Sequence, residues 1–160
     1  MDERRMEPYK QLTRELQINI LGPELEPGSV YSRANWAFQR ASDMGRIDVT
    51  FGGITGSRKA VAMYESLGMQ CEIHIGGFGN LAILGSTTEE QCEYYERGLT
   101  TPDEDRDECP VFLNKPCDPL DMDGYVGIPQ GPGLGIEPNW DYIKENFLPE
   151  TSSPNVQFEG

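Results

Sequence analysis

The sequence predicts an α/β fold, a partial (β/α) barrel of about four parallel β/α units followed by an irregular C-terminal segment. Two observations predict it. Helix-like and strand-like segments alternate strictly through residues 2–95, with short connections between them. The strand-like segments begin roughly 20–30 residues apart, which is the length of one β/α unit, and four units make half of an eight-stranded barrel.

Apolar spacing and turn residues predict the first unit. A helix is predicted over 2–16, because Leu12 and Leu16 lie four residues apart on one face between charged side chains. A strand is predicted over 17–22, and the pair Gly22-Pro23 interrupts it.

The second unit begins with a capping signal. Ser29 is a good N-cap for a helix that is expected to run to about Met44, with Gly45 as its stop. The next strand is predicted over 46–51.

The two remaining units follow glycine-rich turns. Apolar spacing and β-branched runs predict the following elements in order: a helix over 57–67, a strand over 69–74, a short helix over 79–85 and a strand over 91–95.

The character of the chain changes after Thr100. We therefore expect residues 1–100 to be the C-terminal half of a barrel, 101–149 an irregular loop and closing segment, and 150–160 a flexible tail. The acidic run 103–108 is interpreted as a solvated loop, with a cation site as the alternative. A turn with one short strand is expected within 123–129, and a last short helix over 140–147.

Composition restricts the partners. Lys+Arg 13 against Asp+Glu 27 gives a formal net charge of −14, which argues against nucleic acid and anionic membranes. An acidic substrate would also be repelled unless a metal ion or a local basic group offsets the charge. The sequence has no long apolar run and no signal peptide, so a cytoplasmic protein is expected. The four cysteines form no Cys-x-x-Cys pair, and we expect reduced thiols.

Four acids or bases lie at or near successive predicted strands: Glu24, Asp48, His74 and Glu93. In a β/α barrel, successive strands deliver side chains to one rim, where chemistry is built. Simpler interpretations stand beside this one. His74, the single histidine, could be structural, Glu24 a loop acid, and Asp48 a cap for the turn at Gly52.

At the level of motifs, the chain resembles the enolase superfamily, in its mandelate racemase and muconate-lactonizing-enzyme branch, from about Glu7 to Ile143. The pieces that carry the resemblance are, in order: Leu21-Gly22-Pro23-Glu24, Asp48 followed by Gly52-Gly53-Ile54-Thr55-Gly56, Glu72-Ile73-His74, Cys92-Glu93-Tyr94-Tyr95-Glu96, Val126-Gly127-Ile128-Pro129 and Gly131-Pro132-Gly133-Leu134-Gly135. Each piece is weak by itself, whereas their order and spacing together are specific.

The resemblance implies roles for the candidate residues. Glu24 would be a ligand of Mg²⁺, and Asp48 and His74 would form a dyad in which His74 is the base. Glu93 would lie near the substrate carboxylate, with Glu96 as the alternative. Enzymes of this superfamily remove a proton next to a carboxylate, using a positioned Lys or His base together with Mg²⁺.

The implied function is that of a Mg²⁺-dependent acid-sugar dehydratase acting on a small carboxylate substrate. A mandelate-racemase-like racemase or epimerase, a cycloisomerase, and a non-catalytic truncated product are the alternatives. A homo-oligomer is expected for the full-length parent.

Two departures from the family pattern qualify this. Gly52 follows Asp48 by four residues where five are usual, and nothing before Glu24 matches the capping domain, the lysine motif or the first two metal ligands. We therefore expect the chain to be a fragment that is inactive by itself.

Overall fold

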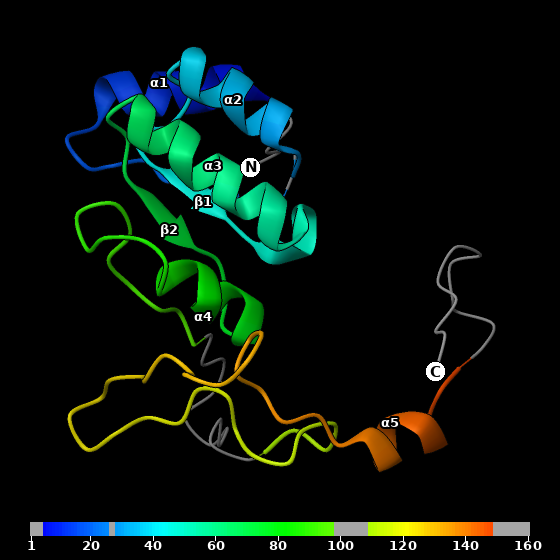
Figure 1. The fold of residues 1–160 in the computed structure, drawn as a ribbon. Helices are drawn as coiled ribbons and strands as arrows, with labels where there is room; N and C mark the ends of the chain where they lie inside the picture. The colour runs from blue at the N-terminus through cyan, green and yellow to red at the C-terminus, as the bar shows by residue number, and fades with distance from the viewer. Residues whose placement is uncertain (1–4, 26–27, 98–108, 149–160) are drawn as a thin grey trace.

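The computed structural model describes residues 5–25, 28–97 and 109–148 (Figure 1). Its elements follow in chain order: α1 (Met6–Glu15), α2 (Val30–Phe38), β1 (Gly45–Ile47), the 3-10 turn η1 (Val49–Phe51), α3 (Gly53–Ser66), β2 (Cys71–Ile73), α4 (Phe78–Leu84) and α5 (Trp140–Glu145). The order of helices and strands agrees with an α/β fold.

The sheet is smaller than expected. β1 and β2 pair in parallel, with Gly45 opposite Cys71 and Ile47 opposite Ile73. On one side a single parallel bridge joins Leu21 to Met44. On the other side the N–H of Cys71 donates to the carbonyl of Gln91 over 2.9 Å. The four segments are thus neighbours in sequence order, but the described residues contain two strands and the number of β/α units is not confirmed.

Side chains accept from one main-chain N–H at each of the two outer segments. At 17–22, the N–H of Ile20 donates to the carboxylate of Asp43 over 2.8 Å. At 91–95, the N–H of Tyr94 donates to the carboxylate of Glu72 over 3.4 Å. Because these donors are directed at carboxylates, they are not available to a neighbouring strand, and no regular ladder forms there.

Several element boundaries differ from the expectation. Ser29 does cap α2, accepting from the N–H of Ser32 over 3.1 Å. The helix nevertheless ends at Phe38 and not near Met44, because Arg40 adopts a left-handed conformation with φ 51°. That conformation stops a helix.

The predicted strand over 46–51 is also shorter. It ends at Ile47, and Asp48 then caps η1 by accepting from the N–H of Thr50. The helix α3 begins at Gly53, four residues before the predicted start.

The core lies between the sheet and the helices on one of its faces. Figure 1 shows α3 across β1 with α2 beside it, and α3 also contacts α4. The buried cluster is made of these residues: Ala37, Ile47, Ala60, Val61, Tyr64, Cys71, Ile73, Ile83 and Cys92. Tyr64 packs directly over Gly45, where an added Cβ would lie 2.2 Å from its ring. Close approach of α3 to the sheet therefore requires glycine at the start of β1.

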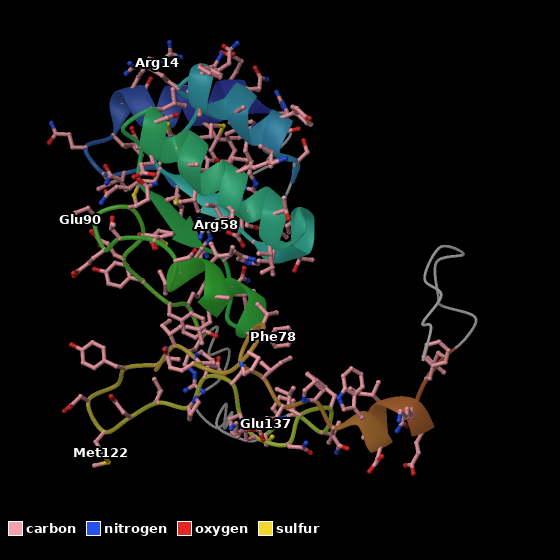
Figure 2. The ribbon with its side chains drawn as sticks, viewed as in Figure 1. Arg14, Arg58, Phe78, Glu90, Met122 and Glu137 are labelled. Carbon is pink, nitrogen blue, oxygen red and sulfur yellow. The ribbon has the colours of Figure 1, made fainter. Side chains whose placement is uncertain are left out.

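Apart from α5, the C-terminal segment 109–148 is irregular, and it lies beyond α4 in Figure 1. Two isolated antiparallel bridges hold it, Leu113 with Pro138 and Leu120 with Val126. Met122, labelled in Figure 2, stands at a fully exposed position in this segment. The acidic run 103–108 and the tail 150–160 lie outside the described residues. Within the described residues, no helix has the length and apolarity that a membrane span requires.

Candidate active site at the strand ends

The register of the sheet brings the first two candidate residues together. Arg46 pairs with Glu72 and Ile47 with Ile73. The N–H of His74 continues the ladder by donating to the carbonyl of Ile47 over 2.7 Å. The next residue after β1 is Asp48, and the next after β2 is His74. Because the two strands are parallel, Asp48 and His74 lie at the same, carboxyl edge of the sheet. Their proximity follows from strand pairing and does not depend on a flexible loop.

His74 lies between two carboxylates. Its Nδ1 is 2.9 Å from Oδ2 of Asp48, and its Nε2 is 2.9 Å from Oε1 of Glu24. The side chain of Asp48 is buried at 4% exposure, His74 is mostly buried at 18%, and Glu24 is half-exposed at 46%. The three residues form a line that runs from the interior to solvent.

The Asp48 carboxylate is held in its ionised form. Its Oδ1 accepts from the N–H of Thr50 over 2.8 Å and from the amide of Asn80 over 3.2 Å. Burial acts to raise the pKa of Asp48, but the hydrogen bonds from His74, Thr50 and Asn80 outweigh it and hold the pKa below its ordinary value. Asp48 therefore caps the turn and orients the imidazole at once, so the two interpretations of this residue are compatible.

Glu24 lies on a loop that a buried arginine organises. Arg33 of α2 is 2% exposed, and its guanidinium donates to the carbonyls of Pro23 over 2.8 Å and Glu24 over 3.2 Å. It also donates to the carbonyl of Arg46 on β1. A guanidinium with five donors can satisfy several carbonyls of an irregular loop. The sequence analysis missed Arg33, although its position one turn before the buried Trp36 and Ala37 was a usable signal.

The structure separates the two candidate acids of the last segment. Glu93 is exposed, and its Oε1 accepts from Gln70 over 3.5 Å, at the amino end of β2. Glu96 accepts from the N–H of Ile75 over 2.8 Å and forms an ion pair with Arg46. Glu93 therefore does not join Glu24, Asp48 and His74 at the strand ends, whereas Glu96 lies next to the residue that follows His74.

A phenol links this rim to the C-terminal segment. The N–H of Gly77 donates to the hydroxyl of Tyr95 over 2.6 Å, and that hydroxyl donates to Asp118 over 2.6 Å. Burial, followed by the Asp118 carboxylate, raises the pKa of Tyr95, so the hydroxyl keeps its proton. An open depression of about 370 Å³ lies beside this link, between the residues after His74 and Phe112. Phe78, labelled in Figure 2, lies on its border.

The described residues do not by themselves form a metal site. No group of three or more His, Cys, Asp and Glu side chains among them is arranged to hold an ion. Glu24 is the one candidate ligand, and Mg²⁺ is normally held by more oxygen ligands than one carboxylate offers. The four cysteines carry free thiols, and Cys71 and Cys92 are buried in the core, as expected for structural thiols.

Comparison with known proteins places this geometry in context. A family profile described as enolase C-terminal domain-like matches residues 1–142. No curated protein sequence gives a significant match.

Solved structures agree with the family profile. A crystal structure of D-glucarate dehydratase from Agrobacterium tumefaciens complexed with magnesium is 37% identical, with a TM-score of 0.84 over 91% of this chain. A 2-chloromuconate cycloisomerase from Rhodococcus opacus 1CP is 21% identical, with a TM-score of 0.69 over 91% of this chain. A racemase from Streptomyces coelicolor A3(2) with bound magnesium is 21% identical, with a TM-score of 0.68 over 88% of this chain.

The likeness covers only part of each relative. This chain spans 38% of the length of the dehydratase, 40% of the cycloisomerase and 36% of the racemase. The last two matches show the fold alone. The resemblance stated from the sequence motifs is confirmed at the level of the family.

Proposed function

Because the chain belongs to the enolase C-terminal domain-like family, we propose that it supplies the general base for removal of a proton next to a carboxylate. The observation that carries the proposal is the line of Asp48, His74 and Glu24, with 2.9 Å at each contact. A neutral imidazole is a suitable base near pH 7, and a carboxylate on one ring nitrogen leaves the other directed at the reacting atom.

Each residue of the line has a step to perform. Asp48 accepts a hydrogen bond from Nδ1–H, which leaves Nε2 as the atom that takes the substrate proton. The Asp48 carboxylate then stabilises the imidazolium that results. With a carboxylate at each ring nitrogen, the ring can donate from both nitrogens; to act as a base it must first lose the Nε2 proton and the contact with Glu24. Since Glu24 is half-exposed, it has room to turn away from the imidazole.

Magnesium is part of the proposal through the relatives. The 37% identical dehydratase was crystallised with it, and a bound Mg²⁺ would neutralise the charge that develops on the substrate carboxylate. In this chain Glu24 is the residue proposed as a ligand. The remaining ligands are proposed to come from the part of the relatives that this chain does not span.

The acid at the substrate carboxylate is proposed to be Glu96 in preference to Glu93. Glu96 lies against the N–H of Ile75, next to His74, whereas Glu93 contacts Gln70 at the opposite end of β2. The matched pair Glu96→Gln and Glu93→Gln separates these two candidates. Activity is expected to fall in the first variant and to be retained in the second.

The proposed substrate is a sugar acid and the proposed reaction is dehydration. The relative with the highest identity among those described above is a sugar-acid dehydratase, whereas the cycloisomerase and the racemase support only the fold. Racemization is the alternative. It is less favoured because it requires a second base, which would have to come from outside this chain. We also propose that an active assembly is a homo-oligomer and that its compartment is the cytoplasm.

The decisive experiment extends the chain upstream with any in-frame coding sequence and screens acid sugars, including D-glucarate, with Mg²⁺. The α-proton of a substrate should exchange with solvent deuterium, and His74→Asn should abolish dehydration. General acid–base catalysis is worth roughly 10²–10⁴-fold, so a loss of that order is expected. Full turnover by the His74→Asn variant would refute the proposal.

A non-catalytic product is the second candidate, and the ligand count favours it for the 160-residue chain itself. We expect no dehydration or racemization of acid sugars by this chain above background in millimolar Mg²⁺. Each missing charge-assisted contact removes on the order of 1.5–3 kcal/mol of binding. Clear turnover by the 160-residue chain would contradict this expectation.

A further inference from the structure

We propose that Asn80 is a positioning residue for the base, which holds both the Asp48 carboxylate and the main chain that carries His74. The inference rests on the proposed function of His74. Asn80 is the third residue of α4 and is 3% exposed. It stands in an apolar helix beside Leu81 and Ile83, so an amide at this position has to be satisfied by specific partners.

The amide of Asn80 is hydrogen-bonded through both of its ends. Its Oδ1 accepts from the N–H of Val49 over 3.0 Å. Its Nδ2 donates to Oδ1 of Asp48 over 3.2 Å and to the carbonyls of His74 over 3.0 Å and Ile75 over 3.3 Å. One side chain therefore connects α4 with Asp48, with Val49 after it and with the backbone that carries the imidazole.

This arrangement fixes which oxygen of Asp48 faces His74. Oδ1 is occupied by Asn80 and the N–H of Thr50, so Oδ2 is left for Nδ1 of the imidazole. Without the amide, one of the two restraints on Oδ1 is lost and the carboxylate can rotate. The Nδ1 hydrogen bond would then be formed for a smaller fraction of the time.

The backbone after His74 gives a second reason to assign this role. Ile75 has φ 55°, a left-handed conformation that a β-branched residue rarely adopts. Its N–H is held by Glu96 and its carbonyl by Asn80. Strained conformations persist where the surroundings over-determine them, and they are concentrated at functional sites. Asn80 thus helps to keep the turn that aims the imidazole.

The test uses the single histidine of the chain. With ¹⁵N-labelled histidine, the imidazole nitrogens of the 160-residue protein give one set of signals that needs no assignment. The readout is the Nδ1 proton, which a hydrogen bond to a carboxylate shifts downfield and protects from exchange. It does not depend on turnover, so it distinguishes failure of this inference from failure of the proposed function.

Two variants and a matched control make the comparison. Asn80→Asp keeps the oxygen that accepts from Val49 and removes the donor, and Asn80→Ser removes the amide. Gln91→Glu is the control, because Gln91 is also a buried amide, 9% exposed, and its Nε2 donates to the carbonyl of Met69 over 3.0 Å at the amino end of β2. It makes the same chemical change away from His74.

The expected result is loss of the protected Nδ1 proton in both Asn80 variants and its retention in Gln91→Glu. In the active extended protein, kcat should fall on the order of 10–100-fold, as it does for residues that orient a ligating or catalytic group. An unchanged Nδ1 signal in the folded Asn80 variants would overturn the proposal. Unfolding of both Asn80 variants while Gln91→Glu stays folded would also overturn it, since Asn80 would then be a residue of general stability.

Discussion

The two faces of the β1–β2 pair differ in what they do. Residues Gly45, Ile47, Cys71 and Ile73 face the helices, and the last three belong to the buried cluster. The alternate residues Arg46 and Glu72 face away from α3 and border an open depression of about 470 Å³, together with Glu96. Asp48 and His74 continue this second, polar series at the carboxyl ends of the strands.

The difference follows from the period of two in a strand. One series of side chains can be apolar and stabilise the fold, while the other carries charges and ends in the hydrogen-bonded pair Asp48 and His74. Substitutions on the two faces should therefore differ in how much they change stability and in whether the change depends on pH.

The largest effect is expected on the helix-facing side. Ile73 is 1% exposed within the buried cluster, so Ile73→Ala should lower the free energy of unfolding by about 2–5 kcal/mol through lost burial and a cavity. Ile18 is 68% exposed and serves as the control. Ile18→Ala should change the free energy of unfolding by less than about 0.5 kcal/mol. Urea unfolding of the three proteins makes the measurement. Equal losses in both variants would remove the distinction between the faces.

A smaller effect is expected where α3 approaches β1. In Gly45→Ala the new Cβ would lie 2.2 Å from the ring of Tyr64, which is 1% exposed and cannot move without cost. Overpacking of this kind should cost about 1–3 kcal/mol. Gly127→Ala is the matched control, since nothing lies within 4 Å of the place its added Cβ would take and its φ is not left-handed. Thermal unfolding should show a lower Tm in the first variant only.

The smallest effect is expected on the polar face, and it depends on pH. Burial, and then the charge of Glu93, raise the pKa of Glu72 above its ordinary 4.5. Because the pKa of Glu72 is higher in the folded than in the unfolded protein, its contribution to stability is fully present below pH 4.5. That contribution is lost as the pH rises through the pKa of Glu72 in the folded protein. Glu72→Gln should therefore be more stable than the parent at pH 7, by under about 1 kcal/mol, because the hydrogen bond from the N–H of Tyr94 and the charge of Arg46 offset part of the cost of burial.

Unfolding as a function of pH checks this prediction. The parent should lose stability relative to Glu72→Gln between pH 4.5 and neutrality. The exposed Glu90 is the control, and Glu90→Gln should follow the parent. If the parent gains stability relative to Glu72→Gln over that range, the pKa of Glu72 is lowered by folding and not raised, and the prediction is wrong.

The sequence by itself determined the order of elements and the place of Asp48 and His74 at neighbouring strand ends. Apolar spacing located α1, α3, α4 and α5 to within a few residues, because helix periodicity is a local property. Strand-end positions and family motifs pointed to Asp48 and His74, and the parallel register then placed them 2.9 Å apart. These predictions succeeded because pairing of parallel strands brings their carboxyl ends together.

Only the tertiary structure decided the remaining features. The contacts of Glu93 with Gln70 and of Glu96 with Ile75 depended on where the irregular segment after Gln91 crosses the end of β2. Arg33 and Asn80 acquire their partners from loops distant in sequence, and no local pattern reports such hydrogen bonds. A period or a motif reports which face a residue occupies, whereas a buried polar contact depends on the three-dimensional positions of both groups.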